Sequence, residues 1–180
     1  MVYFFVLLFF VLFLFFFFFF LMIRRPPRST PLYSSAASDC IRDSNYSQVT
    51  ARLLMDKIRA EALQYLGVGE RASQQEMEDL YAKALSAYIE KGIEYELLSP
   101  ELAEFDLNKL GAAIDGKRDL QFSYLGLQTL YDRYFIHHND TRIELPQCFF
   151  MRVAMGLAVE EDNREARAIE FYNRSPASTT

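Results

Sequence analysis

The stretch SQQEMEDLYAKALSAYIEKG, from Ser73 to Gly92, carries the clearest structural signal in the sequence. Ser73 and Glu76 form the S-x-x-E pattern of a capping box, in which each side chain bonds to a backbone amide of the other residue. Apolar residues then recur every three or four positions, which is the spacing of one helix face. Gly92 favours the end of the helix, because glycine readily adopts the left-handed conformation found there. The stretch predicts an amphipathic helix whose buried face consists of Met77, Leu80, Tyr81, Ala84, Leu85, Tyr88 and Ile89.

Similar helical patterns lie on both sides of this stretch. Around 49–66 the apolar residues Leu54, Ile58, Ala62 and Tyr65 share one face, with Asn45 or Ser47 as candidate cap and Gly67 and Gly69 as the stop. Downstream, the sequence predicts a helix start at Ser99-Pro100-Glu101 and a short helix that Asp106 caps, which runs to Ile114 and closes at Gly116. The run after Asp119 has apolar residues at Leu120, Tyr124, Leu127, Leu130 and Tyr131, which predicts a helix from about Ser123 to Arg133. Pro146 opens a further helix, and a last one lies near Arg164 to Tyr172.

One short hairpin interrupts the helices. Two apolar or β-branched stretches, 134–136 and 142–145, flank the segment HHNDT, in which Asn139 and Asp140 favour a turn. No repeat of fixed period is visible, so a solenoid is not expected. The expected fold class is therefore mainly α, a helical region with one short β-hairpin.

The first 38 residues differ in composition from the rest of the chain. Residues 1–23 are apolar and uncharged, and 11 of the 17 phenylalanines lie in the first 20 positions. Their length is that of a membrane-spanning helix, whereas a secretory signal peptide would carry basic residues before the apolar run. Natural spans mix more residue types than this one, so we interpret 1–38, with its Arg/Pro/Ser-rich connector, as a low-complexity artefact. A membrane anchor over 1–23 that carries a helical interaction module is the alternative.

The remainder of the chain is acidic. From Cys40 onward, 23 Asp and Glu outnumber 16 Lys and Arg, and they are spread along the helical stretches. This distribution argues against a nucleic-acid partner. The two cysteines, Cys40 and Cys148, are too few for a disulfide framework or a four-thiolate zinc site. A reduced, cytoplasmic protein with one domain in this part of the chain is the expectation.

No catalytic or metal motif emerges from the residues themselves. His137, His138 and Asp140 are interpreted as solvated turn residues, since neighbouring strand residues point to opposite faces. Cys148 has no histidine near it in the sequence and is interpreted as a packed or half-exposed helical residue. The tyrosines at helical spacing are interpreted as core and rim, and the carboxylates of 94–106 as a solvated acidic face. These groups are Tyr81, Tyr88, Tyr124, Tyr131 and Tyr134, and Glu94, Glu96, Glu101, Glu104 and Asp106.

Four longer strings resemble one enzyme family in their order and spacing. They are YSQVTARLLMDKIRAEAL (46–63), GIEYELLSPELAEFDL (92–107), RDLQFSYLGLQTLYDRYF (118–135) and RIELPQCFFMRVAMGLAV (142–159). Two patterns are especially specific, D-x-x-F-S-Y-L-G-x-x-x-L at 119–130 and E-x-P-Q-x-F-x-M-R-V-A-x-G at 144–156. The chain thereby resembles the large (alpha) subunit of class I ribonucleotide reductase, the ribonucleoside-diphosphate reductase, over roughly residues 44–173.

The resemblance implies a cytoplasmic, allosteric enzyme of deoxyribonucleotide biosynthesis for DNA replication. Such an enzyme reduces ribonucleoside diphosphates with thioredoxin or glutaredoxin as reductant, is controlled by ATP and dNTP effectors, and works as a large-subunit homodimer with a small (beta) subunit that supplies a metal-based radical cofactor. It also implies a layout of ATP cone, helical region and catalytic α/β barrel. On this basis we divide the chain into 1–38, the artefact and connector; 39–173, the helical region; and 174–180, a tail outside the family pattern. Both ends are expected to be truncated.

The resemblance further implies that this segment is inactive alone. Ribose reduction by this route needs three cysteines at one pocket, and neither Cys40 nor Cys148 lies in a stretch like the family's catalytic motifs. No catalytic, cofactor-binding or metal-binding residue is therefore carried over. Arg59 is the one candidate site residue, as a weak contact for the ATP effector, because the family places a basic residue near this point. Apolar faces such as 149–157 are expected to be exposed in the isolated segment, leaving it loosely packed.

Overall fold

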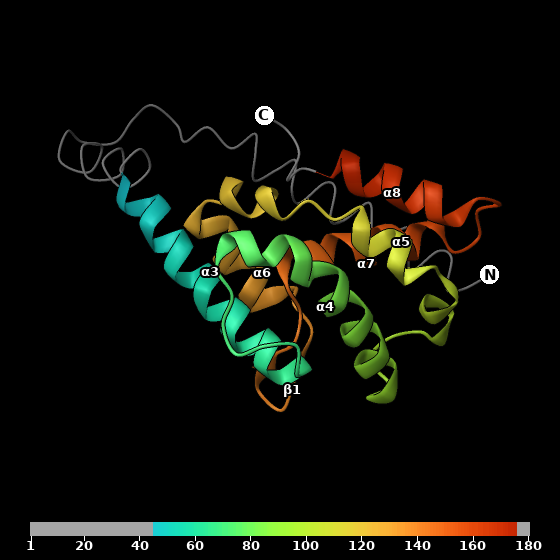
Figure 1. Cartoon of the computed structure of the whole chain (residues 1–180), viewed down its shortest axis with the longest axis horizontal. Coiled ribbons are helices and arrows are strands. Elements are labelled where there is room, and N and C mark those ends of the chain that lie inside the picture. The colour runs from blue at the N-terminus through green and yellow to red at the C-terminus, as the bar shows by residue number, and fades with distance from the viewer. Residues whose placement is uncertain (1–44, 176–180) are drawn as a thin grey trace, which may run out of the picture. The chain divides into compact units, whose positions relative to one another are not determined.

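The computed structural model describes residues 45–175, which all fall within one compact unit, Asp43–Thr180 (Figure 1). The predicted segment 1–38, with its candidate membrane span, and residues 176–180 of the predicted tail lie outside the described residues. The described elements are, in order, α3 (Asn45–Leu66), α4 (Gln74–Glu94), the 3-10 helix η1 (Pro100–Glu104), α5 (Leu107–Ala112), the 3-10 helix η2 (Gly116–Gln121), α6 (Tyr124–Arg133), β1 (His137–His138), β2 (Thr141–Arg142), α7 (Pro146–Ala158) and α8 (Arg164–Arg174). The expected fold class, mainly α with one short hairpin, is confirmed.

Helix α4 begins as its sequence predicts. The Ser73 side chain accepts from the Glu76 backbone N–H, and the Glu76 carboxylate accepts from the Ser73 backbone N–H at 2.7 Å. The predicted apolar face is buried, with Leu80 half-buried at its edge. The predicted stop at Gly92 is wrong, because α4 continues to Glu94 and the left-handed residue is Glu96, at φ 56°. Gly92 instead leaves room for Leu98, whose side chain would lie 2.4 Å from a Cβ at that position.

Helix α3 ends at the predicted glycine but begins earlier than predicted. Gly67 has φ +73°, and the N–H of Val68 reaches back to the carbonyl of Leu63, as in a glycine-terminated helix. Asn45 and Ser47 lie inside the helix, so neither is its cap as predicted. The α3 face with Ile58, Ala62 and Leu63 is fully buried.

Between α4 and α6 the chain forms shorter and more tightly wound helices than its sequence predicts. Ser99 and Asp106 cap as predicted, but the helix that Ser99 starts is the 3-10 turn η1, and α5 ends at Ala112. Gly116 does not close a helix; it begins η2, in which the backbone N–H of Lys117 donates to the Asp115 side chain. The η2 segment passes over α3, α4 and α7, and this position decides the site described below.

The hairpin turns at the predicted residues, although its strands are displaced. Asn139 and Asp140 both have positive φ, 49° and 61°, as a two-residue hairpin turn requires. The paired residues are only His137 with Arg142 and His138 with Thr141. The predicted strands at 134–136 and 142–145 are therefore largely wrong, since Tyr134 caps the end of α6 and Leu145 precedes α7.

The apolar residues of the described segment form one continuous core. Helix α7 lies at its centre and packs against α8, while α6 packs alongside α3 (Figure 1). The expectation that 149–157 is an exposed face is wrong: Phe149 is 6% and Phe150 8% exposed, and only Leu157 reaches 36%. In α6 only Leu127 and Leu130 are buried, so the predicted face is narrower than expected. Phe150 is covered from within the chain by Phe122, whose ring stacks on it with centroids 6.1 Å apart.

Candidate functional site

The carboxylate of Asp119, in η2, is buried and accepts hydrogen bonds from three different helices. Arg59 of α3 donates to Oδ2 at 2.8 Å, Tyr81 of α4 donates to the same oxygen at 2.7 Å, and Gln147 of α7 donates to Oδ1 at 2.8 Å. All four residues are buried. A buried carboxylate is tolerated when its charge is paired and its lone pairs are occupied, and both conditions are met here. Asp119 thus ties three helices to η2.

The environment shifts the acid–base properties of this group. Burial raises the pKa of Asp119, against the hydrogen bonds from Tyr81, Arg59 and Gln147 that favour the carboxylate. Burial and the neighbouring Asp119 charge raise the pKa of Tyr81 well above its usual value, so its phenol stays a donor. The Tyr81 hydroxyl therefore keeps its proton at neutral pH and donates it to Asp119 in a hydrogen bond that positions α4 against η2.

The network continues from Gln147 to the last helix. The hydroxyl of Tyr172, in α8, donates to Gln147 Oε1 at 2.9 Å and accepts from the backbone N–H of Asp115 at 3.2 Å. The guanidinium of Arg118 lies over the Tyr172 ring, 4.2 Å from its centroid. Gln147, buried between Asp119 and Tyr172, has donor and acceptor both in use. The polar chain from Arg59 to Tyr172 thus spans the described fold.

A second buried carboxylate, Glu144, joins the hairpin to α4 and α7. Its Oε1 accepts from the Tyr88 hydroxyl at 2.8 Å and from Arg152 Nε at 2.7 Å, and its Oε2 accepts from the backbone N–H of Ile136 at 3.0 Å. Burial alone would lower the pKa of Arg152, but the Glu144 carboxylate and the Tyr88 hydroxyl outweigh it and raise that pKa. Glu144 thereby fixes the chain just before α7. Asp119 and Glu144, the two buried carboxylates that each join several elements, are called the two hubs below.

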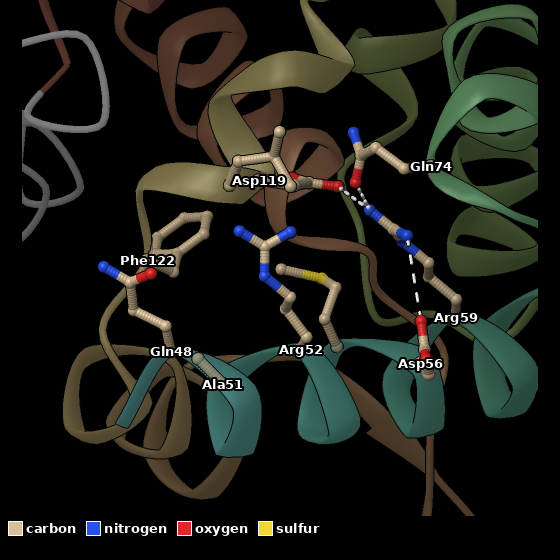
Figure 2. A pocket seen from close by; sticks show the side chains of 10 residues that line it. Gln48, Ala51, Arg52, Asp56, Arg59, Gln74, Asp119 and Phe122 are labelled. Carbon is tan, nitrogen blue, oxygen red and sulfur yellow. Dashed lines mark hydrogen bonds and ion pairs between the residues drawn. The ribbon is translucent and has the colours of Figure 1, made fainter. Parts of the chain in front are cut away.

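One cavity opens beside the Arg59–Asp119 pair, between α3 and η2 (Figure 2). Its volume is about 150 Å³. In Figure 2 the Arg52 side chain rises from α3 between Phe122 and the Arg59–Asp119 pair. The Nε of Arg59 is buried without a hydrogen-bond partner. The lining residues are Gln48, Ala51, Arg52, Met55, Asp56, Arg59, Gln74, Asp119, Leu120 and Phe122.

The candidate residue Arg59 is thus at this site, in a role that its sequence position does not reveal. Besides Asp119, its Nη2 donates to the side-chain carbonyl of Gln74, and its Nη1 lies 4.0 Å from Asp56. Its side chain is 4% exposed. A contact of Arg59 with ATP stays a prediction.

The histidines and the aspartate of the hairpin do not line this cavity. His138 is not the solvated turn residue expected: it is half-buried, its Nδ1 lies 2.5 Å from the Tyr65 hydroxyl, and its ring stacks on Tyr95 with centroids 4.2 Å apart. His137 and Asp140 are exposed as expected. Among residues 45–175, no three His, Cys, Asp or Glu side chains gather where a metal ion could bind.

Cys148 is fully buried, and burial raises the pKa of its thiol well above the usual value, which suits a packing residue. Cys40 lies outside the described residues. The acidic residues of 94–106 are exposed, as expected of a solvated face. The tyrosines divide as predicted between core, with Tyr81 and Tyr88, and rim.

Reasoning from residue types missed the two hubs. Asp119 and Glu144 are the first positions of the two specific patterns, which do not by themselves reveal that these side chains are buried. The signal was present for Glu144, because a single acid between Ile143 and Leu145 in an apolar run must find a donor if the run is buried. For Asp119 the partners lie 60, 38 and 28 residues away, so no local pattern announces them.

Comparison with known proteins identifies the sequence around these hubs. Residues 120–174 match the family model described as ribonucleotide reductase, all-alpha domain. The chain is 42% identical to ribonucleoside-diphosphate reductase subunit alpha of Chlamydia trachomatis over 139 residues, 77% of this chain and 13% of that protein. It is 44% identical to the subunit of the same name from Chlamydia muridarum over 140 residues, again 77% and 13%. The Helicobacter pylori subunit is 37% identical over 144 residues, 74% of this chain and 18% of that protein.

The helical fold and the matched segment identify this part of the chain as a ribonucleotide reductase all-alpha domain. More closely, the chain belongs to the family of ribonucleoside-diphosphate reductase large subunits, of whose curated Chlamydia members it spans 13%. Within the described part of the chain, each helix is too short or too polar to cross a membrane.

Proposed function

We propose that this chain serves as the helical N-terminal region of a ribonucleoside-diphosphate reductase large subunit. In that role it is part of a cytoplasmic enzyme that reduces ribonucleoside diphosphates to deoxyribonucleoside diphosphates. The observation that supports this most is that the two specific sequence patterns meet in space: Asp119 of the first and Gln147 of the second are hydrogen-bonded at 2.8 Å. The family model matches residues 120–174, a range that contains the second pattern and all but the first residue of the first pattern.

The proposal includes the division of the chain at residues 38 and 173 and the partners that the relatives' activity requires. These partners are a second large subunit, a small subunit that supplies the radical, the diphosphate substrate, and ATP and dNTP effectors. The segment's own part is structural. The buried carboxylates of Asp119 and Glu144 hold α3, α4 and α7 at fixed positions, and Gln147 extends this network to Tyr172 of α8. Regions flanking the segment in the whole protein thereby have a rigid support.

The segment alone is proposed to be inactive. Reduction of the ribose needs one thiol as the transient radical and two more as the electron-donating pair. The described residues contain Cys148, which is buried and protonated, and the sequence contains one further cysteine, Cys40. Two thiols are one fewer than the reaction uses.

An activity assay tests the proposal. The purified 180-residue chain is mixed with cytidine diphosphate, dithiothreitol and the small subunit of the Chlamydia trachomatis reductase, and deoxycytidine diphosphate is measured. We expect no product, while the full-length Chlamydia trachomatis alpha subunit under the same conditions gives product. Turnover that depends on the small subunit would contradict the proposed inactivity.

The proposal retains Arg59 as a contact for the ATP effector, on the resemblance alone. The guanidinium is held by Asp119 and Gln74, so this contact requires the pairing to open. NMR of arginine-labelled chain detects such opening as a change in the Arg59 Nη signals when ATP is added. Unchanged Nη signals at saturating ATP in a full-length chimera that responds to ATP would remove Arg59 from the effector site.

A further inference from the structure

A line of four buried side chains connects the cavity between α3 and η2 with the C-terminal end of α8. It runs from Arg59 through Asp119 and Gln147 to Tyr172, with donor–acceptor distances of 2.8, 2.8 and 2.9 Å in that order. The Arg59–Asp119 pair lines the cavity, so this end of the line borders open space (Figure 2). The line therefore joins the first described helix, at a cavity, to the last one.

Gln147 links the two halves of this line through a single rigid group. A carboxylate only accepts hydrogen bonds, so the Gln147 amide turns its NH₂ group toward Asp119 Oδ1, and its carbonyl oxygen then accepts from the Tyr172 hydroxyl. A planar amide cannot rotate one of these ends without rotating the other. Gln147 is fully buried, so water does not replace a bond that the rotation breaks. A change in the bond to Asp119 therefore changes the bond from Tyr172.

The far end of the line lies where α8 ends. The Tyr172 hydroxyl also accepts from the backbone N–H of Asp115, at 3.2 Å. Arg118 donates to the Tyr172 carbonyl at 3.1 Å and to the hydroxyl and the carbonyl of Ser175 at 2.8 and 3.3 Å. Its guanidinium lies over the Tyr172 ring. Arg118 and Asp119 are consecutive residues of η2, so a shift of η2 that moves Asp119 also moves these contacts with the end of α8.

We propose that this line is a conformational relay, in which the Arg59–Asp119 pair and the C-terminal end of α8 are coupled through the Gln147 amide. With the pair closed, the amide is held by Asp119 and accepts from Tyr172. With the pair open, the buried Asp119 carboxylate loses the charge that compensates it, the amide is released, and Tyr172 loses its acceptor. The coupling follows contiguous hydrogen bonds.

The relay is a property of the described fold and does not depend on the activity of the whole protein. Its use in controlling that activity rests on the proposed function, in which the remainder of the reductase subunit follows α8. A movement of α3, or an occupant of the cavity that draws Arg59 away from Asp119, would then change how α8 ends. Measurements on the chain by itself test the coupling, so they hold even if the reductase role is wrong.

The test measures both ends of the relay by NMR in the folded 180-residue chain. The Arg59 Nε–H is buried, so its exchange with solvent reports opening of the pair. We expect Tyr172→Phe, which removes one hydroxyl and keeps the ring, to speed this exchange about threefold or more, the scale of one net hydrogen bond. Because coupling is reciprocal, Arg59→Lys should speed exchange of the Asp115 backbone N–H, which the Tyr172 hydroxyl accepts, by a similar factor.

Tyr88→Phe is the matched control. It removes a buried hydroxyl that donates to the other hub, Glu144, at 2.8 Å, and it lies outside the relay, so exchange at Arg59 should not change. In a Gln147→Met background, which makes neither amide bond, Tyr172→Phe should no longer affect Arg59. The relay is refuted if Tyr172→Phe leaves exchange at Arg59 unchanged, if Tyr88→Phe speeds it equally, or if the effect persists without the Gln147 amide. The first two comparisons decide the question should the Gln147→Met variant fail to fold.

Discussion

Arg59 and Asp119, 60 residues apart in the sequence, form a buried ion pair in which Nη2 lies 2.8 Å from Oδ2. Their side chains are 4% and 1% exposed. Each charge has left water, and each is compensated mainly by the other. The pair therefore couples the first described helix, α3, to the η2 segment.

Removing one partner of this pair should be strongly destabilising. We expect Asp119→Leu or Arg59→Met to lower the free energy of unfolding by about 3–5 kcal/mol, because each leaves a buried charge unpaired. The double variant should lose at least about 1 kcal/mol less than the sum of the two single losses. Urea denaturation of the four proteins measures this coupling.

The exposed pair Lys117–Glu78 serves as the control for that cycle. Its charged atoms are 3.8 Å apart, and its side chains are 72% and 47% exposed. We expect a coupling energy below about 1 kcal/mol there. Equal coupling energies for the two pairs would mean that burial contributes nothing to the Arg59–Asp119 interaction.

Asp119 should give the protein an unusual dependence on pH. Burial raises the pKa of Asp119 above the value of about 3.9 that the unfolded chain has. The folded state then binds the proton more tightly, so the contribution of Asp119 to stability is present below that value and is lost as pH rises through the raised pKa. The free energy of unfolding of wild type minus that of Asp119→Asn should fall between pH 4 and the raised pKa. A difference that rises over this range would show that the charged form is the favoured one.

The contact between α4 and α5 depends on a missing side chain. A Cβ on Gly111 would lie 2.8 Å from the Cα of Ala82, a backbone atom that cannot rotate away. We expect Gly111→Ala to destabilise the fold by about 1–3 kcal/mol, as overpacking does. Gly156→Ala is the matched control, since it is also helical and has no atom within 4 Å of the added Cβ. That variant should be neutral or gain up to about 1 kcal/mol, so similar effects of the two substitutions would rule out the close approach.

The continuous core predicts cooperative unfolding of the described segment. Tyr81, Tyr88 and Tyr172 are fully buried and hydrogen-bonded, so they should give a strong near-ultraviolet circular dichroism signal. We expect this signal and the far-ultraviolet helix signal to disappear in one thermal transition. Loss of the tyrosine signal while the helix signal persists would indicate a loosely packed state.

Local signals in the sequence predicted local structure well. The Ser73–Glu76 capping box, the Asp106 cap and the Asn139–Asp140 turn each depend on residues within four positions of each other, and the structure has all three. The prediction that α4 ends at Gly92 was wrong because a glycine can occur in a helix for two different reasons. It can end a helix or admit a neighbour, and here it admits Leu98.

Contacts between distant residues explain the remaining differences. The 3-10 segment η2 is held by Asp119 and by Gln74, whose amide donates to the carbonyl of Gly116 at 2.7 Å across 42 residues. The face 149–157 is covered by Phe122 and by α8, which no periodicity within α7 can reveal. For the same reason the sequence around Arg59 does not reveal its partner Asp119, 60 residues away.

A segment exchange tests most directly whether residues 39–173 serve as the helical region of a reductase large subunit. The matching 139-residue segment of the Chlamydia trachomatis alpha subunit is replaced by that of this chain, and reduction of cytidine diphosphate is measured with the Chlamydia trachomatis small subunit. An exchange with the Chlamydia muridarum segment controls for the junctions. We expect the chimera to retain reduction that depends on the small subunit, and to lose it when Asp119→Leu is added. A folded chimera without activity, beside an active control, would contradict the account.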